Sequence, residues 1–301
     1  MSVVLLSGGT GGAKLARGLY DLLGEELAVI ANTGDDIEIY GAHVSPDPDL
    51  VSYRLADCID ERGFGIAGDS FAAMEMLERL GAEAWCRLGD RDLALCLRRR
   101  TLLEAGRTLS EAHAELSAAL GVRARVIPMS DDPVRTAIRS GERLIGLQEF
   151  LIRERGAGPI DDVSFEGAER AAASPAALAA LEDASAVVIG PSNPIISIGP
   201  ILAVGELRAA LEAAAVPVIA VSPIVAGSVL KGPTAACLTW AGRSVDAAGV
   251  AEHYGELIDA IVADEPVAGI RCHRCETRMD DPGARRELAR ETLALAEALR
   301  G

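Results

Sequence analysis

The chain has 301 residues, of which 29 are Lys or Arg and 45 are Asp or Glu, which gives a formal net charge of −16. This acidic balance disfavours binding to nucleic acid or to an anionic membrane, because each phosphate contact needs a local cation. Only 3% of the residues are aromatic, which also argues against a surface that stacks single-stranded bases. The 50% of hydrophobic residues instead predict a globular chain with ample core.

The chain opens without a basic segment followed by an apolar one, so we expect no secretory signal. Its six cysteines are sparse for this length and are typical of reduced thiols in the cytoplasm, where we place the protein. Residues 186–205 and 213–230 carry no charge, but prolines interrupt both stretches. A bilayer span must satisfy its own backbone hydrogen bonds, so we predict buried strands and structured loops there instead.

The first elements predict an α/β domain with a mainly parallel sheet. Residues 3–6 form a short apolar run, residues 13–23 repeat apolar side chains at helical spacing, and residues 27–31 form a second apolar run. A strand, a glycine-rich turn, a helix and a strand make one βαβ unit, whose strands lie parallel. We therefore predict a Rossmann-like, three-layer fold in which residues 1–301 form a single domain.

The next part of the chain has a helical pattern. Residues 50–59 predict one helix, and residues 70–80 predict another that is capped by Ser70. Residues 91–120 predict a small helical insert in two pieces, because a capping-box spacing of Thr and Glu starts a new helix at Thr108.

The strand signal returns at residues 125–127, after which Asp132 and Pro133 have the sequence of a helix N-cap and its first helical residue. The remaining predicted elements are strands at residues 186–189 and 216–221, a helix between them at residues 205–215 and a last helix at residues 282–299. These elements predict a second βαβ unit in the same sheet.

Glycines dominate the turn after the first strand, where residues 8–14 read Gly-Gly-Thr-Gly-Gly-Ala-Lys. Such a turn lets backbone N–H groups approach an anion closely, and the start of the following helix adds positive charge. We predict that phosphate is held by Gly8, Gly9, Thr10, Gly11, Gly12 and Lys14. The alternative is a tight turn that needs only positive φ. Lys14 stands where a dinucleotide fingerprint has Gly or Ala, and the Gly that precedes Lys in a P-loop is missing.

Paired carboxylates follow the second strand, in Asn-Thr-Gly-Asp35-Asp36. Ligands of open α/β sheets bind at the carboxyl ends of the strands, and carboxylates there suit Mg²⁺. The alternative is an Asp-rich turn that caps the next segment. Three more segments allow both a ligand-binding and a purely structural interpretation: residues 45–49, where Asp49 would cap a helix, residues 87–92, an alternating-charge corner, and residues 190–194, where Ser192 and Asn193 offer hydrogen bonds.

Together these segments resemble the 2-phospho-L-lactate transferase family of coenzyme F420 biosynthesis. The resemblance rests on residues 6–15, 32–36, 45–49, 88–92, 128–133 and 190–194, and it extends to residues 222–224 and 249–251. None of these motifs is decisive alone. Their number and their occurrence in the family's order make the resemblance specific, and together they span nearly the whole chain.

The resemblance implies a Mg²⁺-dependent transfer. The terminal ribityl hydroxyl of the deazaflavin FO attacks the phosphate of a three-carbon acid, and GMP leaves from the guanosine-diphosphate-activated donor. Asp49 and Arg87 match family positions that contact FO, and Asp35 matches an acidic position near the metal, which makes Asp35 and Asp49 the candidate catalytic residues. The glycine segment, Ser192 and Asn193 would hold the donor's phosphates or guanosine. The resemblance also suggests a homodimer.

Two alternatives stay open. A related branch resembles gluconeogenesis factors, which bind a nucleotide sugar as regulators. That branch follows the double Asp with Gly-Gly-Ser-Ser, whereas residues 37–41 here read Ile-Glu-Ile-Tyr-Gly. The other alternative, an NAD-dependent oxidoreductase, is weakened by Lys14.

The sequence leaves open which three-carbon acid the donor carries, whether 2-phospho-L-lactate or phosphoenolpyruvate. It also leaves open which of Asp35, Asp36 and Asp49 acts as general base. From the sequence we expect Asp49→Ala to leave the fold intact and to abolish transfer to FO.

Overall fold

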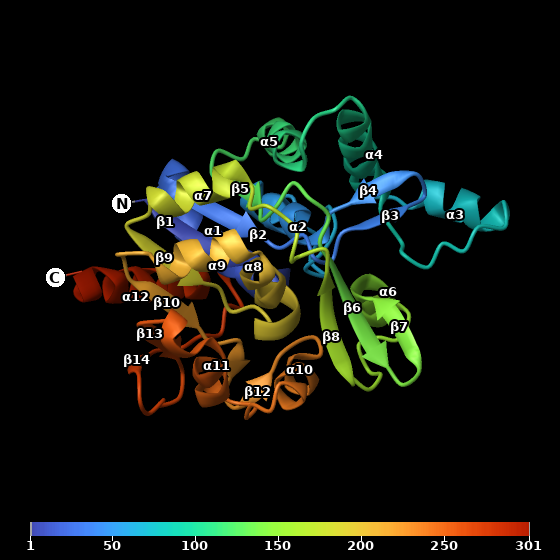
Figure 1. The fold of residues 1–301 in the computed structure, drawn as a ribbon. Coiled ribbons are helices and arrows are strands. Elements are labelled where there is room, and N and C mark those ends of the chain that lie inside the picture. The colour runs from blue at the N-terminus through green and yellow to red at the C-terminus, as the bar shows by residue number, and fades with distance from the viewer. Residues whose placement is uncertain (1, 301) are drawn as a thin grey trace.

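The computed structural model describes residues 2–300 and is built around one seven-stranded sheet (Figure 1). The strands, in spatial order, are β5 (Arg125–Pro128), β2 (Leu27–Ala31), β1 (Val3–Ser7), β9 (Ala186–Ile189), β10 (Val218–Val221), β13 (Ala260–Ala263) and β14 (Arg271–Arg274). All neighbouring strands in it are parallel. Its order is that of a doubly wound nucleotide-binding sheet with one added edge strand. The predicted Rossmann-like class is confirmed.

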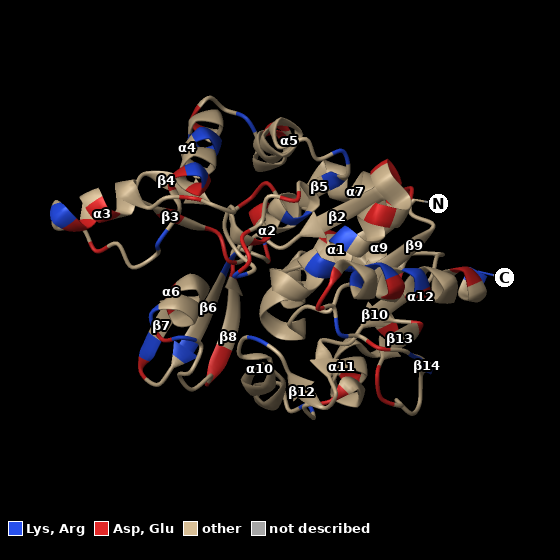
Figure 2. Cartoon of the chain, turned by 180° about the vertical axis from the view of Figure 1, so that it is seen from behind, with Lys and Arg blue, Asp and Glu red and all other residues tan. Residues whose placement is uncertain are grey.

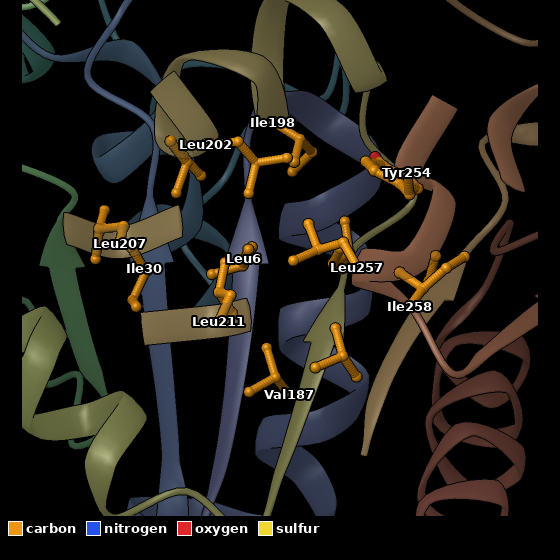
Figure 3. Packing of buried hydrophobic residues seen from close by; sticks show 14 of the residues in the cluster. Leu6, Ile30, Val187, Ile198, Leu202, Leu207, Leu211, Tyr254, Leu257 and Ile258 are labelled. Atoms are coloured by element: carbon orange, nitrogen blue, oxygen red, sulfur yellow. The ribbon is translucent and has the colours of Figure 1, made fainter. Parts of the chain in front are cut away.

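Helices cover both faces of this sheet. One face carries α1 (Gly9–Leu23), α2 (Pro46–Leu55) and α12 (Pro282–Arg300), and the other carries α7 (Pro175–Glu182), α8 (Gly199–Ala203), α9 (Gly205–Glu212) and α11 (Ala247–Tyr254). Successive strand residues point to opposite faces, so Leu5 packs in one core and Leu6 in the other. Figure 3 shows Leu6 and Val187 of the strands beside Leu211 of α9. These three layers leave the central strands apolar on both faces.

Two smaller units lie beyond the carboxyl ends of the strands (Figure 1). In the first, the hairpin β3 (Ile37–Ile39) and β4 (Ala42–Val44) packs with α3 (Ala72–Arg79) and α4 (Asp90–Glu104) around its own small core, and α5 (Leu109–Ala119) follows. The Thr108 hydroxyl accepts from Glu111 N, and the Glu111 carboxylate accepts from Thr108 N. The two predicted helical pieces and the capping box between them are therefore confirmed.

The second unit is an antiparallel sheet that the sequence did not reveal. It has the order β7 (Arg143–Gly146), β6 (Arg135–Ser140), β8 (Asp162–Glu166), and α6 (Leu147–Ile152) joins β7 to the segment before β8. The predicted helix at Asp132 is wrong. The Asp132 carboxylate accepts from Ala172 N, 40 residues further on, so it ties two distant loops together instead of capping a helix.

Two predicted helix starts also need correction. The helix predicted at residues 50–59 begins at Pro46 and ends at Leu55, so Asp49 lies inside its first turn instead of capping it. The helix predicted from Ser70 begins at Ala72, and its first amides are capped by the distant carboxylate of Asp90. In the second case a carboxylate 18 residues further along the chain determines the start.

The remaining described elements are short. They are the 3₁₀ turns η1 (Gly24–Glu26) and η3 (Gly255–Leu257), the π-helix η2 (Pro194–Ile198), the hairpin β11 (Ile224–Val225) and β12 (Ser228–Val229), and α10 (Thr234–Trp240). Within residues 2–300 no single helix is long and apolar enough to cross a membrane; one helix pair, Pro194–Ala203 with Gly205–Glu212, passes on length and composition but is bent by 92°.

Candidate active site

The sheet order places a crevice between β1 and β9. From β1 the chain winds outward through β2 to β5, and from β9 it winds the other way, so the order reverses between these two strands. A cavity of about 1120 Å³ opens at their carboxyl ends. Ten of the eleven residues predicted from the sequence line it: Gly8, Gly9, Thr10, Gly11, Lys14, Asp35, Asp49, Arg87, Ser192 and Asn193. Gly12 lies behind them.

The sequence predicts a glycine-rich turn before a helix that starts at residue 13. In the structure α1 already begins at Gly9, so most of these glycines lie in its first turn. Gly9 has φ +66°, and its N–H donates to the Asp47 carboxylate at 2.5 Å. A Cβ on Gly11 would lie 1.9 Å from the Pro191 carbonyl oxygen, and one on Gly12 would lie 2.3 Å from the Ser7 hydroxyl oxygen. Close packing of this turn against the segment after β9 therefore explains these glycines, whether or not phosphate binds.

Three carboxylates gather at the end of β2, and acidic stretches are visible at the junction of α2, β3 and β6 (Figure 2). Asp47 accepts from Gly9 N and from Asn32 Nδ2 at 2.9 Å, and burial raises its pKa to about 6. Asp36 accepts from the Ser45 hydroxyl at 2.8 Å and contacts His43 Nε2 at 3.0 Å. Each of these two side chains is thus occupied within the protein.

Asp35 differs from them because one of its oxygens has no partner. Its Oδ2 accepts from Gln148 Nε2 at 2.9 Å, whereas the buried Oδ1 has no hydrogen-bond partner among the described residues. Burial, followed by the charges of Asp47 and Asp36, raises the pKa of Asp35 well above its usual range. Gln148 comes from α6, and no local sequence signal marked it.

These residues fit a divalent cation. Mg²⁺ prefers hard oxygen ligands and often binds through one or two carboxylates together with substrate phosphates. The free oxygen of Asp35 supplies such a ligand at the cavity wall, and a cation would offset the repulsion among the three carboxylates. The candidate ligand atoms of Asp35, Asp36 and Asp47 are all oxygens, which suit a hard cation better than a softer metal.

Asp49 is held by a residue that the sequence analysis missed. Its Oδ1 pairs with Arg99 of α4, whose side chain is 0% exposed, and Arg99 also donates to the His43 carbonyl at 3.0 Å. Burial raises the pKa of Asp49, and Arg99 opposes that rise. The Asp49 Oδ2 atom is buried and has no hydrogen-bond partner within residues 2–300. Arg99 lies in a run of three arginines, which is typical of a solvated helix face.

Arg87 lies beside aromatic side chains in the lining of the cavity. It is 47% exposed, donates to Glu78 at 2.7 Å and lies 5.6 Å from the centre of the Phe71 ring. Four of the chain's ten aromatic residues line the cavity: Tyr53, Phe64, Phe71 and Trp85. Such a concentration in an aromatic-poor chain suits a flat, unsaturated ligand.

The cavity lining also carries a lysine and polar side chains from α1 and from the segment after β9. Lys14 is half-buried, and burial lowers the pKa of its ammonium, with the cations of Arg54 and Arg285 acting in the same direction. Ser192 Oγ accepts from Gly8 N at 3.2 Å. Asn193 Oδ1 caps η2. Lys14 is one of the donors that line the cavity and could face an anionic ligand.

The buried imidazole of His113 makes a prediction about pH. His113 Nε2 contacts the hydroxyls of Ser52 and Ser117, and burial lowers its pKa to about 3. The unfolded chain takes up this proton near pH 6.5, so its stabilising contribution is complete above pH 6.5 and is lost as pH falls from there towards 3. We expect His113 to contribute a decline of about 1.4 kcal/mol per pH unit in that window.

Urea denaturation of the protein and of His113→Gln between pH 4 and 8 measures this decline. Glutamine is neutral throughout, so the stability of the variant should fall less steeply with acid. Equal slopes for the two proteins would contradict the assignment.

Comparisons with known proteins show which family this chain resembles in sequence. A family model described as 2-phospho-L-lactate transferase CofD matches residues 3–284. The 2-phospho-L-lactate transferase of Methanosarcina mazei is 38% identical over 298 residues, covering 95% of this chain and 98% of that protein. Its counterpart from Methanopyrus kandleri is 40% identical over 311 residues, covering 100% and 99%.

A relative with another name is equally similar. The phosphoenolpyruvate transferase of Streptomyces avermitilis is 40% identical over 317 residues, covering 100% of this chain and 99% of that protein. A crystal structure of a UPF0052 family protein from Bacillus halodurans superposes with a TM-score of 0.65 at 15% identity, covering 97% of this chain and 98% of that one, and supports the fold alone. Matched in sequence along nearly its whole length, the chain belongs to the 2-phospho-L-lactate transferase family and is a transferase.

Proposed function

We propose that the protein transfers a phosphorylated three-carbon acid, 2-phospho-L-lactate or phosphoenolpyruvate, from its guanosine-diphosphate-activated form to the ribityl hydroxyl of FO. GMP is released, and the product is F420-0 or its dehydro form. The observation that carries this proposal is one cavity whose lining combines four aromatic side chains, an unpartnered carboxylate oxygen and Lys14 beside the glycine segment. The sparse cysteines predict a cytoplasmic location and the family resemblance predicts a homodimer, and both of these remain predictions.

The acceptor fits the aromatic side chains of the cavity. A deazaflavin is flat and would stack on rings such as Phe71 and Trp85, while Arg87 offers hydrogen bonds beside Phe71. Asp49 lines the same cavity, and its unpartnered Oδ2 would accept from a ribityl hydroxyl.

The donor fits the part of the cavity around Lys14 and the start of α1. Lys14, Thr10 and the first turn of α1 would face its phosphates, and Ser192 and Asn193 would lie beside them. Asp35 would hold Mg²⁺, which supplies charge neutralisation to phosphate oxygens. The protein's own residues orient the hydroxyl and the phosphate and exclude water, so positioning accounts for much of the rate.

Mass spectrometry tests the reaction directly. Purified protein with FO, Mg²⁺ and either activated donor should release GMP and form the matching product, and EDTA should stop both. The preferred donor identifies the three-carbon acid. If no donor gives product and a nucleotide sugar binds instead, the chain acts as a regulator like the gluconeogenesis factors, and the proposal is wrong.

A further inference from the structure

We propose that Asp92 of α4 takes the proton from the attacking hydroxyl and forms one proton-sharing pair with Asp49. The inference rests on the proposed function and deepens it by naming the proton acceptor. From the sequence, Asp92 belonged to an alternating-charge corner with no expected role, whereas it is partly buried and lines the cavity.

The geometry brings the two carboxylates together. Single ligand atoms of Asp49, Asp92 and Cys96 all lie within 4.8 Å of one another. Asp92 Oδ1 accepts from the Tyr53 hydroxyl at 2.6 Å, and no hydrogen bond to Asp92 Oδ2 occurs within residues 2–300. Asp49 is likewise held through Oδ1, by Arg99, while its Oδ2 stays unpartnered in a side chain that is 8% exposed. Each carboxylate is therefore fixed by one oxygen and keeps the other available.

Electrostatics makes this pair suited to hold a proton near neutral pH. Two close carboxylates in a poorly solvated site oppose each other's ionisation, so the second of them ionises only at a raised pH and the pair titrates as a unit. Burial, with the charge of Asp49 next in size, raises the pKa of Asp92 to about 6. Among the described residues, the other titratable or charged groups that face the pair are Asp36, His43, Tyr53, Asp69, Cys86, Cys96, Arg99 and His113.

A metal ion suits this cluster less well than a proton. Arg99 already places a positive charge on Asp49, which opposes a second cation there. Burial raises the pKa of the Cys96 thiol well above its usual range, so the thiolate that a metal needs is disfavoured. The free oxygens of Asp49 and Asp92 are therefore best explained as a site for a shared proton.

The chemical step balances without a further reactant. The hydroxyl oxygen forms a bond to the phosphorus that carries the three-carbon acid, and its proton passes to Asp92. The bond from that phosphorus to the bridging oxygen breaks, and GMP leaves with the electron pair. Asp92 is the more basic partner because Arg99 pairs directly with Asp49. Tyr53 and Arg99 act as positioning residues.

A titration tests the pair independently of turnover. Carbon-13 NMR of aspartate-labelled protein should show a carboxyl that titrates near pH 6 and that is absent in Asp92→Asn. In Asp49→Asn, the same signal should move to lower pH, because a like charge is removed and Arg99 is released. If Asp92 titrates near pH 4 in the unmodified protein, the pair does not hold a proton and the proposal is overturned.

Kinetics tests the role in the reaction. Asp92→Asn should lower kcat about 100- to 10,000-fold, the range for a general base, while the KM for FO changes less than about threefold. The fall of kcat below pH 6 should disappear in Asp92→Asn. In Tyr53→Phe that fall should move to higher pH, because the lost hydrogen bond stabilised the anion.

Glu104→Gln is the matched control, since Glu104 is an exposed carboxylate of the same helix. It should keep the full rate. A kcat of Asp92→Asn within about threefold of the unmodified protein would overturn the proposal. If the unmodified protein forms no product with any donor, the proposed function fails, and with it the assignment of Asp92 to that step; the NMR titration still decides whether the pair holds a proton.

Discussion

Asp49→Ala is expected to abolish transfer to FO and to destabilise the fold by about 3–5 kcal/mol, because it leaves the fully buried guanidinium of Arg99 without its counter-ion. From the sequence alone the fold was expected to stay intact, and the ion pair is the reason for this change. Urea denaturation measures the stability, and GMP release measures the transfer.

A double variant separates the two effects. Asp49→Ala with Arg99→Met removes both charges and should recover most of the lost stability, while transfer stays absent. If Asp49→Ala alone unfolds at the same urea concentration as the unmodified protein, the buried pair does not carry the expected energy. Normal turnover of FO by Asp49→Ala would show that the acceptor binds elsewhere.

Asp35→Asn is expected to lower Mg²⁺-dependent turnover at least about 1000-fold, which corresponds to several kcal/mol of lost charge stabilisation. The same change should make the metal-free protein more stable at pH 8. Burial, Asp47 and Asp36 raise the pKa of Asp35, so its ionised form is disfavoured in the fold. This penalty is absent below the unfolded-state pKa near 3.9 and grows above it, by at least about 1.4 kcal/mol for one pKa unit.

Thermal unfolding in EDTA and in Mg²⁺ measures both consequences. Mg²⁺ should raise the melting temperature of the unmodified protein and of Asp57→Asn, whose carboxylate is 72% exposed and pairs with Arg17 outside the cavity lining. It should leave Asp35→Asn unchanged. If Mg²⁺ stabilises Asp35→Asn as much as the unmodified protein, Asp35 is not a ligand.

The sequence by itself determined the parallel sheet and its two βαβ units. The apolar runs at β1, β2 and β9 and the capping box at Thr108 are local signals, in which a few neighbouring residues carry the whole pattern. It also predicted ten residues of the cavity lining, because motifs that follow parallel strands must meet at the carboxyl edge of one sheet.

Only the tertiary structure decided which polar side chains pair. Arg99 lies 50 residues from Asp49 along the chain, and Gln148 lies 113 residues from Asp35. Propensity and periodicity extend over a few turns of chain, so they carry no information about such partners. The same limit made Asp92 look like a solvated corner and Asp132 like a helix cap. In the folded protein Asp92 accepts from Tyr53 and Asp132 accepts from Ala172. These distant partners determine what each side chain does.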